Sequence, residues 1–350
     1  MISSAHFVDN VGHPETAISV PQTVRHVLPL FQQNKGQFLT DTLQYLYEET
    51  TKTHFYAIHR DDQQVTGDLD ATKQRYTELK ARLLWHMGYP GAKIVEVVGN
   101  STAYSLLGTQ RAWRFLEAHL PIDAIWLYGY TAQAHPDGTK CVNGTVADLI
   151  ERKGHGDKTL GALVAYHSLH ALEEGGWGGA LLPRYLLIYG DDETNDATGT
   201  HFGEDITTSD FLADKLLLLD GGIQSFRQAC NFFLLEKPIV SLSNLQASLS
   251  TFQDCDLRTW GDSDFGDSFQ PSECGLFSAS GFLQFLRRRA MANPEFASEE
   301  WLEAEARAYF ETHLFGDPAK TNLAAKQKAF NDAWRFFKQH KLYEKLHFLD

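Results

Sequence analysis

The sequence has no apolar run close to the roughly 18 residues that a membrane-spanning helix needs. Its first residues, MISSAHFVDN, lack the basic start and the apolar core of a secretory signal. Cysteine is also scarce: the four cysteines are widely spaced, and no CxxC pair indicates a zinc site or a disulfide framework. We therefore expect a cytoplasmic protein with free thiols, no membrane partner, no metal and no cofactor.

Basic residues are outnumbered as well, with 31 against 45 acidic ones, and the formal charge is −14. A chain with this balance is not expected to bind nucleic acid through a general basic surface, although a small anionic ligand needs only a local positive site. The GxGxxG and P-loop fingerprints of common dinucleotide and triphosphate sites are absent. With 350 residues, 43% of them hydrophobic, the chain can form one large domain with additions, or two domains.

The pattern of apolar residues divides the chain into three segments. Residues 1–90 predict a helical N-terminal extension, with helices over 38–47 and 72–87. Residues 91–245 alternate apolar strands with helices, which predicts an α/β fold with a Rossmann-like, doubly wound parallel sheet. Residues 246–350 predict a long loop followed by a helical C-terminal extension. The expected strands are 94–98, 124–128, 185–189, 216–219 and 239–242, while 160–172 fits either a strand followed by a helix or one helix.

Ligand-type residues follow four of the expected strands. Each of these strand ends combines glycine with a hydroxyl, amide or carboxylate side chain. Ligands of open parallel sheets bind beyond the carboxyl ends of the strands, so four such ends favour a ligand site over simple turn chemistry. The four ends are Gly99-Asn100-Ser101, Gly129-Tyr130-Thr131, Gly190-Asp191-Asp192 and Asp220-Gly221-Gly222.

The turn at residues 220–222 is the best candidate for a phosphate site. Its two glycines let the backbone approach a ligand closely. The first helical residues after it, Ile223, Gln224 and Ser225, direct free N–H groups and a positive dipole end to the same place. An ordinary strand-to-helix turn has the same residues, and that alternative stays open. Arg227, one turn into the helix, either supplies positive charge or lies on the solvated helix face, and we expect the second.

Four segments between residues 93 and 245 follow one another in a recognisable order. They are 95–101 (VEVVGNS), 127–131 (LYGYT), 142–148 (VNGTVAD) and 213–238, which runs from Ala-Asp through the Gly-Gly turn to Lys-Pro. This order resembles the Rossmann-like superfamily of the cytokinin-activating phosphoribohydrolases, once labelled lysine decarboxylases, and of the nucleotide-sensing SLOG domains. The resemblance implies a nucleotide ligand contacting Gly144 and Thr145 among others, and a homodimer.

Departures from this superfamily argue against its usual hydrolysis. The PGGxGTxxE turn of the phosphoribohydrolases corresponds to residues 220–228, where Gln228 replaces the catalytic glutamate. A family arginine that precedes the Ala-Asp pair corresponds to Asp205. An amide cannot act as a general base, so both hallmark catalytic residues are missing. Asp220, in place of the family's proline, would repel a phosphate unless it pairs with a cation or a ribose hydroxyl.

Three functions follow from these residues. The first is binding or sensing of a nucleotide-derived molecule, phosphoribosyl or NAD-like, with a phosphate on the Gly221-Gly222 turn. The second is N-glycosidic hydrolysis or transfer on a nucleotide, in which Glu204 or Asp205 from the acidic run after residue 190 serves as a relocated catalytic carboxylate; a plain acidic surface loop is the simpler interpretation of that run. The third is a protein-interaction module with a degenerate pocket. We expect the first.

Overall fold

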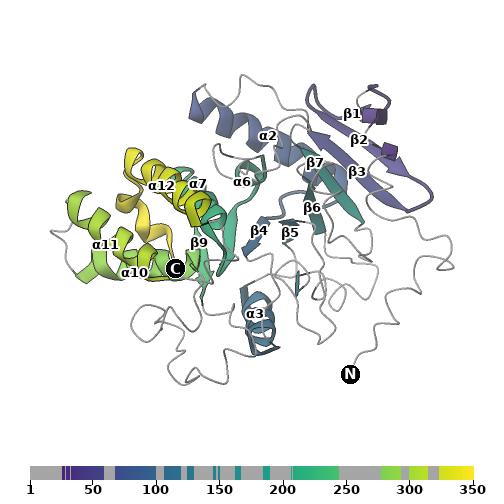
Figure 1. The fold of residues 1–350 in the computed structure, drawn as a ribbon. Helices are drawn as coiled ribbons and strands as arrows, with labels where there is room; N and C mark the ends of the chain where they lie inside the picture. The colour runs from purple at the N-terminus through teal and green to yellow at the C-terminus, as the bar shows by residue number, and fades with distance from the viewer. Residues whose placement is uncertain are drawn as a thin grey trace.

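The computed structural model of the protein contains one nine-stranded sheet with helices on both faces (Figure 1). The strand order is β1-β2-β3-β7-β6-β5-β4-β8-β9, which confirms the predicted Rossmann-like α/β fold. The structure describes residues 26–27, 29–31, 33–58, 68–99, 106–119, 124–129, 145–146, 149, 162–166, 184–189, 206, 208–243, 277–292, 299–313 and 323–350.

Seven neighbouring strands of the sheet run parallel. Short apolar runs formed these strands because both faces of the sheet are covered, so no alternation with polar residues is needed. All five predicted strands are confirmed, and 160–172 contains a strand, as one of its two interpretations required. The parallel strands, in spatial order, are β3 (Thr53–Ile58), β7 (Tyr185–Tyr189), β6 (Ala162–Tyr166), β5 (Ile125–Gly129), β4 (Ile94–Gly99), β8 (Lys215–Leu219) and β9 (Ile239–Leu242).

The predicted helix over 38–47 is wrong. This segment forms β1 (Gln37–Phe38) and most of β2 (Leu43–Glu48), which pairs antiparallel with β3 in a hairpin. The aromatic residues of LQYLYE and of its partner strand THFYAI favour a pleated and half-buried surface. The N-terminal segment therefore extends the sheet, because β3 pairs in parallel with β7.

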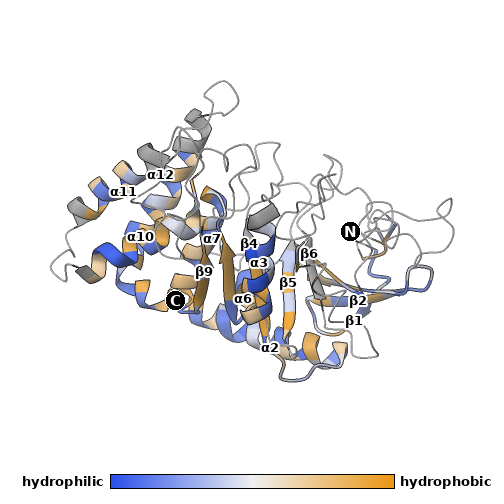
Figure 2. Cartoon of the chain, turned by 90° about the horizontal axis from the view of Figure 1, so that it is seen from below, coloured by the Kyte–Doolittle hydropathy of each residue, from blue (hydrophilic) through white to orange (hydrophobic). Residues whose placement is uncertain are grey.

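One face of the sheet is covered by α3 (Leu106–His119). Ala112 and Leu116 of this helix are fully buried in a cluster with Val97 of β4 and Trp126 of β5. In Figure 2, α3 contains residues coloured blue as hydrophilic, whereas strands such as β9 are coloured as hydrophobic. A helix thus follows β4, in agreement with the alternation of strands and helices predicted for residues 91–245.

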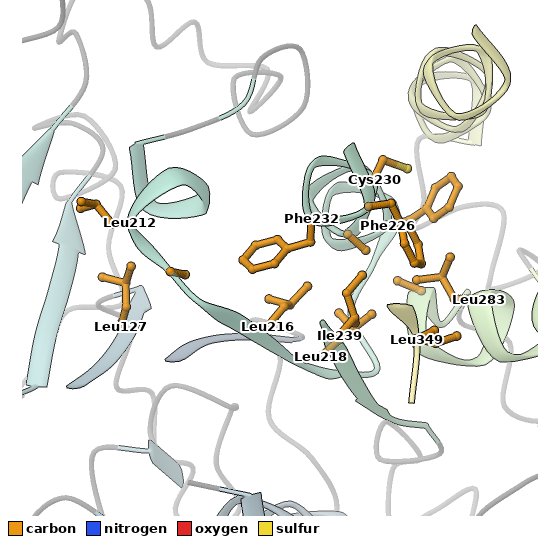
Figure 3. Close-up of a cluster of buried hydrophobic side chains, with 14 of the residues drawn as sticks. Leu127, Leu212, Leu216, Leu218, Phe226, Cys230, Phe232, Ile239, Leu283 and Leu349 are labelled. Atoms are coloured by element: carbon orange, nitrogen blue, oxygen red, sulfur yellow. The ribbon is translucent and has the colours of Figure 1, made fainter. Parts of the chain in front are cut away.

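The opposite face carries the larger core and most of the helices. The predicted helix over 72–87 is confirmed as α2, with Tyr76, Leu79 and Leu83 buried at helical spacing. Figure 3 shows Phe226, Cys230 and other side chains packed over the sheet residues Leu216 and Leu218. The helices of this face are α2 (Leu69–Met87), α6 (Thr208–Leu212), α7 (Ile223–Leu234), α10 (Ala279–Ala292), α11 (Glu299–His313), α12 (Leu323–Gln339) and the 3-10 helix η5 (Leu342–Phe348).

The C-terminal helices pack on α7 and return the chain to the sheet. Phe226 of α7 lies at the centre of an aromatic group, with ring centroids 5.1 Å from Phe282 and 5.9 Å from Phe337. After η5, Leu349 bridges in parallel to Ile239 at the edge of β9. None of the helices in the described ranges is both long enough and apolar enough to cross a membrane.

Candidate functional site

The carboxyl ends of β4 and β8 meet at the point where the sheet reverses its direction of winding. From β4 the chain builds β5, β6 and β7 outward on one side, and then crosses over to place β8 and β9 on the other side. Gly99 at the end of β4 lies beside Leu219 at the end of β8. The helix that follows β4 covers one face and the helix that follows β8 covers the opposite face. Open α/β sheets bind their ligands in the crevice at such a switch point.

The turn after β8 has an unusual backbone. Asp220 and Gly221 both have left-handed φ angles, 52° and 80°, and α7 begins at Ile223 immediately after Gly222. A Cβ atom at position 221 would lie only 2.4 Å from the Cβ of Ser225, so Gly221 is required both for its φ angle and for its close approach to the helix. A Cβ at position 222 would meet no atom of the described chain within 4 Å. The turn therefore has no space for a side chain at Gly221, whereas Gly222 borders open space among the described residues.

The amino end of α7 has features that favour the binding of a negatively charged group. No side chain caps the helix at Gly222, and its first turn contains no acidic residue. The first helical bond runs from the Phe226 N–H to the Gly222 carbonyl at 3.0 Å, and the N–H groups of Gly222 and Ile223 donate to no acceptor in the described ranges. Helix N-termini attract anions through such N–H groups and through the helix dipole. Gln224 is exposed beside them, whereas Ser225 is buried against Gly221.

Asp220 does not point a free carboxylate at this opening. Its side chain is fully buried, and its Oδ1 accepts a 2.8 Å hydrogen bond from the Ser278 hydroxyl. The backbone carbonyls of Asp220 and Gly221 accept bonds from the N–H groups of Ser280 and Ala279, at 3.0 and 2.8 Å. These hydrogen bonds attach residues 220–221 to the first turn of α10. The sequence raised Asp220 as a residue that would repel a phosphate, and the structure gives its carboxylate a hydrogen-bond donor in the interior.

The other predicted ligand residues fall into three groups. Gly99 and Gly129 end the adjacent strands β4 and β5, so the structure brings them to the same edge of the sheet as Gly221 and Gly222. Thr145 is helical and almost fully buried. The remaining predicted residues lie outside the described residues: Asn100, Ser101, Tyr130, Thr131, Gly144, Gly190, Asp191, Asp192 and the two proposed catalytic carboxylates Glu204 and Asp205.

Gln228, at the position of the family's catalytic glutamate, belongs to a buried polar network beneath α7. Its Nε2 donates to Glu96 Oε1 of β4 at 2.8 Å and to Asp210 Oδ1 of α6 at 3.0 Å. Asn231, one turn further along α7, donates from Nδ2 to Asp210 Oδ2 at 2.7 Å. These bonds tie α7 to the strand and to the helix under it. The position therefore has a structural role in this chain.

Arg227 does not lie on the solvated helix face, and that expectation is wrong. The side chain is 4% exposed, its Nη1 donates to Asn231 Oδ1, and its guanidinium carbon lies 3.3 Å from the centroid of the Phe336 ring of α12. The prediction treated α7 as a surface helix, but α12 covers it. A guanidinium stacks well on an aromatic face, which explains why the charge is tolerated there.

Lys237 completes the network at the end of α7. Its Nζ donates to the backbone carbonyls of Asp210, Phe211 and Ala213 at 2.6, 2.8 and 2.6 Å. Burial, with the charge of Lys80, lowers the pKa of Lys237 to about 8. We nevertheless assign it the charged form at neutral pH, because an ammonium group with three carbonyl partners uses all of its donors. Lys237 fixes the segment that leads into β8, and hence the position of the turn at 220–222.

Glu96 is a buried acid of the network with a strongly perturbed pKa. Burial, followed by the neighbouring Asp210 carboxylate, raises its pKa well above the ordinary value of 4.5. The unfolded chain loses this proton at a lower pH than the folded chain does. The contribution of Glu96 to stability is therefore complete in acid and is lost as the pH rises towards its folded pKa.

The Glu96→Gln variant should remove this pH dependence. We expect its free energy of unfolding to decline less than that of the wild type between pH 5 and pH 8, because glutamine carries no proton to lose. Urea denaturation at several pH values measures the difference. Glu117→Gln, on α3, is the control for the loss of an exposed carboxylate. Parallel profiles for Glu96→Gln and the wild type would show that Glu96 does not keep its proton.

Sequence reasoning missed Glu96, Asp210 and Ser278. Glu96 had a visible signal, since a carboxylate interrupts the apolar strand IVEVVG. Asp210 and Ser278 had none, because their partners are brought to them only by the packing of α6 and α10. Among the described residues no group of three or more His, Cys, Asp and Glu side chains converges as a metal site.

Comparison with known proteins does not assign the chain to a family. No family model matches the sequence, and no curated protein matches it. The resemblance to the phosphoribohydrolase and SLOG superfamily therefore rests on the four segments described above and stays a prediction. The chemistry of the site has to be argued from the turn and the helix themselves.

Proposed function

We propose that the protein binds a nucleotide-derived small molecule, with a phosphate group at the amino end of α7. The observation that carries the proposal is the position of the Gly221-Gly222 turn at the switch point between β4 and β8. The uncapped N–H groups of Gly222 and Ile223 supply the donors that a phosphate needs. Gly222 leaves room for a ligand atom to approach them.

The remaining parts of the ligand would follow the sheet edge towards β5. In this proposal the ribose or base lies near Gly99, Asn100 and Ser101, and near the residues after Gly129. Asp220 contributes through the shape of the turn, because its carboxylate is engaged by Ser278. Gln224 is exposed in the first turn of α7 and is suited to hydrogen-bond a phosphate oxygen or a ribose hydroxyl.

Binding or sensing is favoured over hydrolysis by the position of Gln228. Its amide is committed to Glu96 and Asp210 beneath α7, and it carries no acid function. An enzyme of this fold would need a relocated carboxylate, for which Glu204 and Asp205 remain the candidates. Incubating the protein with AMP or NAD and measuring the free base separates these functions. Base release that disappears in Glu204→Ala or Asp205→Ala would establish the hydrolase.

The third candidate function is a protein-interaction module with a degenerate pocket, and a thermal-shift experiment tests it. A ligand that binds only the folded state stabilises it by RT ln(1 + [L]/Kd), so AMP or NAD at about 1 mM should raise the melting temperature if Kd lies well below that concentration. No shift with any nucleotide would favour the protein-interaction module. We also propose that the protein is cytoplasmic and forms a homodimer, and light scattering of the purified protein tests the dimer directly.

The Gly222→Asp variant tests the position of the phosphate. Aspartate is a preferred N-cap, and its charge suits the helix dipole, so α7 should become more stable by a few tenths to about 1 kcal/mol. The same carboxylate would occupy the N–H groups and repel a phosphate. We therefore expect a raised melting temperature together with AMP binding that is at least about tenfold weaker, which calorimetry measures.

Gly222→Ala is the matched control for this experiment. Alanine is compatible with the extended backbone of Gly222 (φ −90°, ψ −163°), and its methyl group meets open space among the described residues. It adds neither a cap nor a charge, so its effect on AMP affinity is that of its methyl group alone, and we expect it to be smaller than that of aspartate. Unchanged binding in Gly222→Asp would place the phosphate away from α7.

A further inference from the structure

Two tyrosine–histidine pairs join the hairpin of β2 and β3 to α2. The Tyr56 hydroxyl of β3 lies 2.9 Å from Nδ1 of His86, in the last turn of α2. The Tyr45 hydroxyl of β2 lies 2.9 Å from Nδ1 of His54, and the ring of Tyr45 packs on that of His86 with centroids 4.3 Å apart. His54 lies near the amino end of β3, whereas the turn at 220–222 follows the carboxyl end of β8. The proposed phosphate site therefore does not use this cluster.

The hydroxyl of Tyr56 fixes the protonation state of His86. Tyr56 is fully buried, and in the described ranges its hydroxyl has no hydrogen-bond partner other than His86. A phenol O–H needs an acceptor, which Nδ1 offers only in the neutral imidazole with its proton on Nε2. A protonated imidazole carries N–H donors at both nitrogens, so the buried Tyr56 O–H would be left without an acceptor. The pair is therefore complete only while His86 is neutral.

The surroundings of the two imidazoles also oppose a positive charge. Burial lowers the pKa of His86, and burial, followed by the charges of Arg184 and His86, lowers the pKa of His54. Burial raises the pKa of Tyr45 and Tyr185, so their hydroxyls carry no negative charge at neutral pH. Neither imidazole pairs with a carboxylate in the part of the chain that the structure describes. Besides Tyr56, the titratable and charged groups around the cluster are Tyr45 and Tyr47 of β2, His54 of β3, Arg184 and Tyr185 at β7, and Tyr89 after α2.

Acid therefore weakens this contact. The unfolded chain takes up the His86 proton near the ordinary imidazole pKa of 6.5, and the folded chain takes it up only at lower pH. The contribution of the pair to stability is complete above pH 6.5 and is lost as the pH falls from there through the folded pKa. This dependence is opposite in sign to that of Glu96, whose contribution is complete in acid. A local measurement is needed to separate the two.

We propose that Tyr56 and His86 form a pH-sensitive lock, which keeps the last turn of α2 on the hairpin while the imidazole is neutral and releases it when the imidazole is protonated. The release is local, because the preceding turns of α2 are held by Leu79 and Leu83, whose apolar packing does not titrate. The lock is independent of the proposed function and needs no ligand.

Amide hydrogen exchange at the end of α2 tests the lock. The N–H groups of Gly88 and Tyr89 donate to carbonyls of the last turn, so their exchange reports whether that turn is formed. After correction for the intrinsic effect of pH, their protection should fall at least about tenfold between pH 7.5 and pH 5 in the wild type. In His86→Gln it should change by less than about twofold, because glutamine accepts from the Tyr56 hydroxyl and takes up no proton. Equal protection of the wild type at both pH values, or a fall that persists in His86→Gln, would overturn the proposal.

His340→Gln is the matched control for this measurement. His340 follows α12, where its ring lies 4.3 Å from that of Phe336, and burial lowers its pKa as well. Removing this imidazole should leave the pH dependence at the end of α2 as it is in the wild type. Loss of that dependence in His340→Gln would refute its assignment to His86.

Titration of the His86 ring, followed by NMR, separates the hydroxyl from burial. In Tyr56→Phe the ring is retained and no O–H loses an acceptor, so His86 should take up its proton at a higher pH than in the wild type. Tyr45→Phe is the control, because it removes the hydroxyl on His54 and leaves the bond between Tyr56 and His86 in place. It should move the titration of His54 and not that of His86. An unchanged His86 titration in Tyr56→Phe would overturn the proposal, and this result decides alone if His86→Gln does not fold.

Discussion

The Gly221→Ala variant is expected to lose about 2–5 kcal/mol of its free energy of unfolding. About 1–2 kcal/mol comes from placing an L side chain in the left-handed conformation that Gly221 adopts, at φ 80°. The rest comes from the new Cβ atom, which would lie 2.4 Å from the Cβ of Ser225 and force the turn and α7 apart. Urea or thermal denaturation followed by circular dichroism measures the loss.

Gly222→Ala is again the matched control, because it changes the neighbouring glycine in the same turn. Its backbone is extended and its added methyl group has space among the described residues, so we expect a change within about 0.5 kcal/mol. Equal losses in the two variants would show that the turn tolerates movement. The turn could then not hold its N–H groups in a fixed position for a ligand.

The Asp210→Ala variant is expected to lose about 3–5 kcal/mol, because it leaves a buried polar network without its acceptor. The amides of Gln228 and Asn231 would each lose a buried partner, and the charge of Lys237 would lose a nearby carboxylate. Asp210→Asn keeps one carbonyl oxygen and should lose less. Both effects are measured as free energies of unfolding in urea.

Asp332→Ala is the control for the loss of a carboxylate. Its side chain pairs with Arg335 on the surface of α12, and surface ion pairs of this kind contribute little. We expect a change of less than about 1 kcal/mol. If Asp210→Ala were as mild as Asp332→Ala, the network would not fix α7 in place. The position of the α7 amino end would then have to depend on the apolar packing around Phe226.

The fold could be predicted from the sequence wherever burial left a simple pattern. The apolar runs at 216–219 and 239–242 indicated strands covered on both faces, and the structure has β8 and β9 there. The segment 38–47 was misjudged because its short strands depend on partners. β2 is stabilised by β3, and β3 by β7, which is far away in the sequence. A local pattern cannot contain that information.

The sequence predicted where the candidate site lies in the chain, but not the contacts of its residues. Glycine pairs and helix starts are local features, so the turn at 220–222 could be identified from its own residues. The surroundings of Asp220 and Arg227 could not, because Ser278 and Phe336 reach them only through the packing of α10 and α12. From the sequence we expected Arg227 on a solvated face of α7. In the structure its outer side is a core shared with the C-terminal helices.

The bridge between Leu349 and Ile239 has a consequence for biosynthesis. β9 is an edge strand of the sheet, and open edges are sites at which chains pair with one another. The backbone N–H of Asp350 donates to the Ile239 carbonyl at 2.8 Å, so part of this edge is covered by residues made long after β9 itself. During synthesis β9 is therefore made before the residues that pair with it at Ile239, and this contact is missing until residue 350 has been added. An uncovered strand edge is a site at which neighbouring nascent chains can pair.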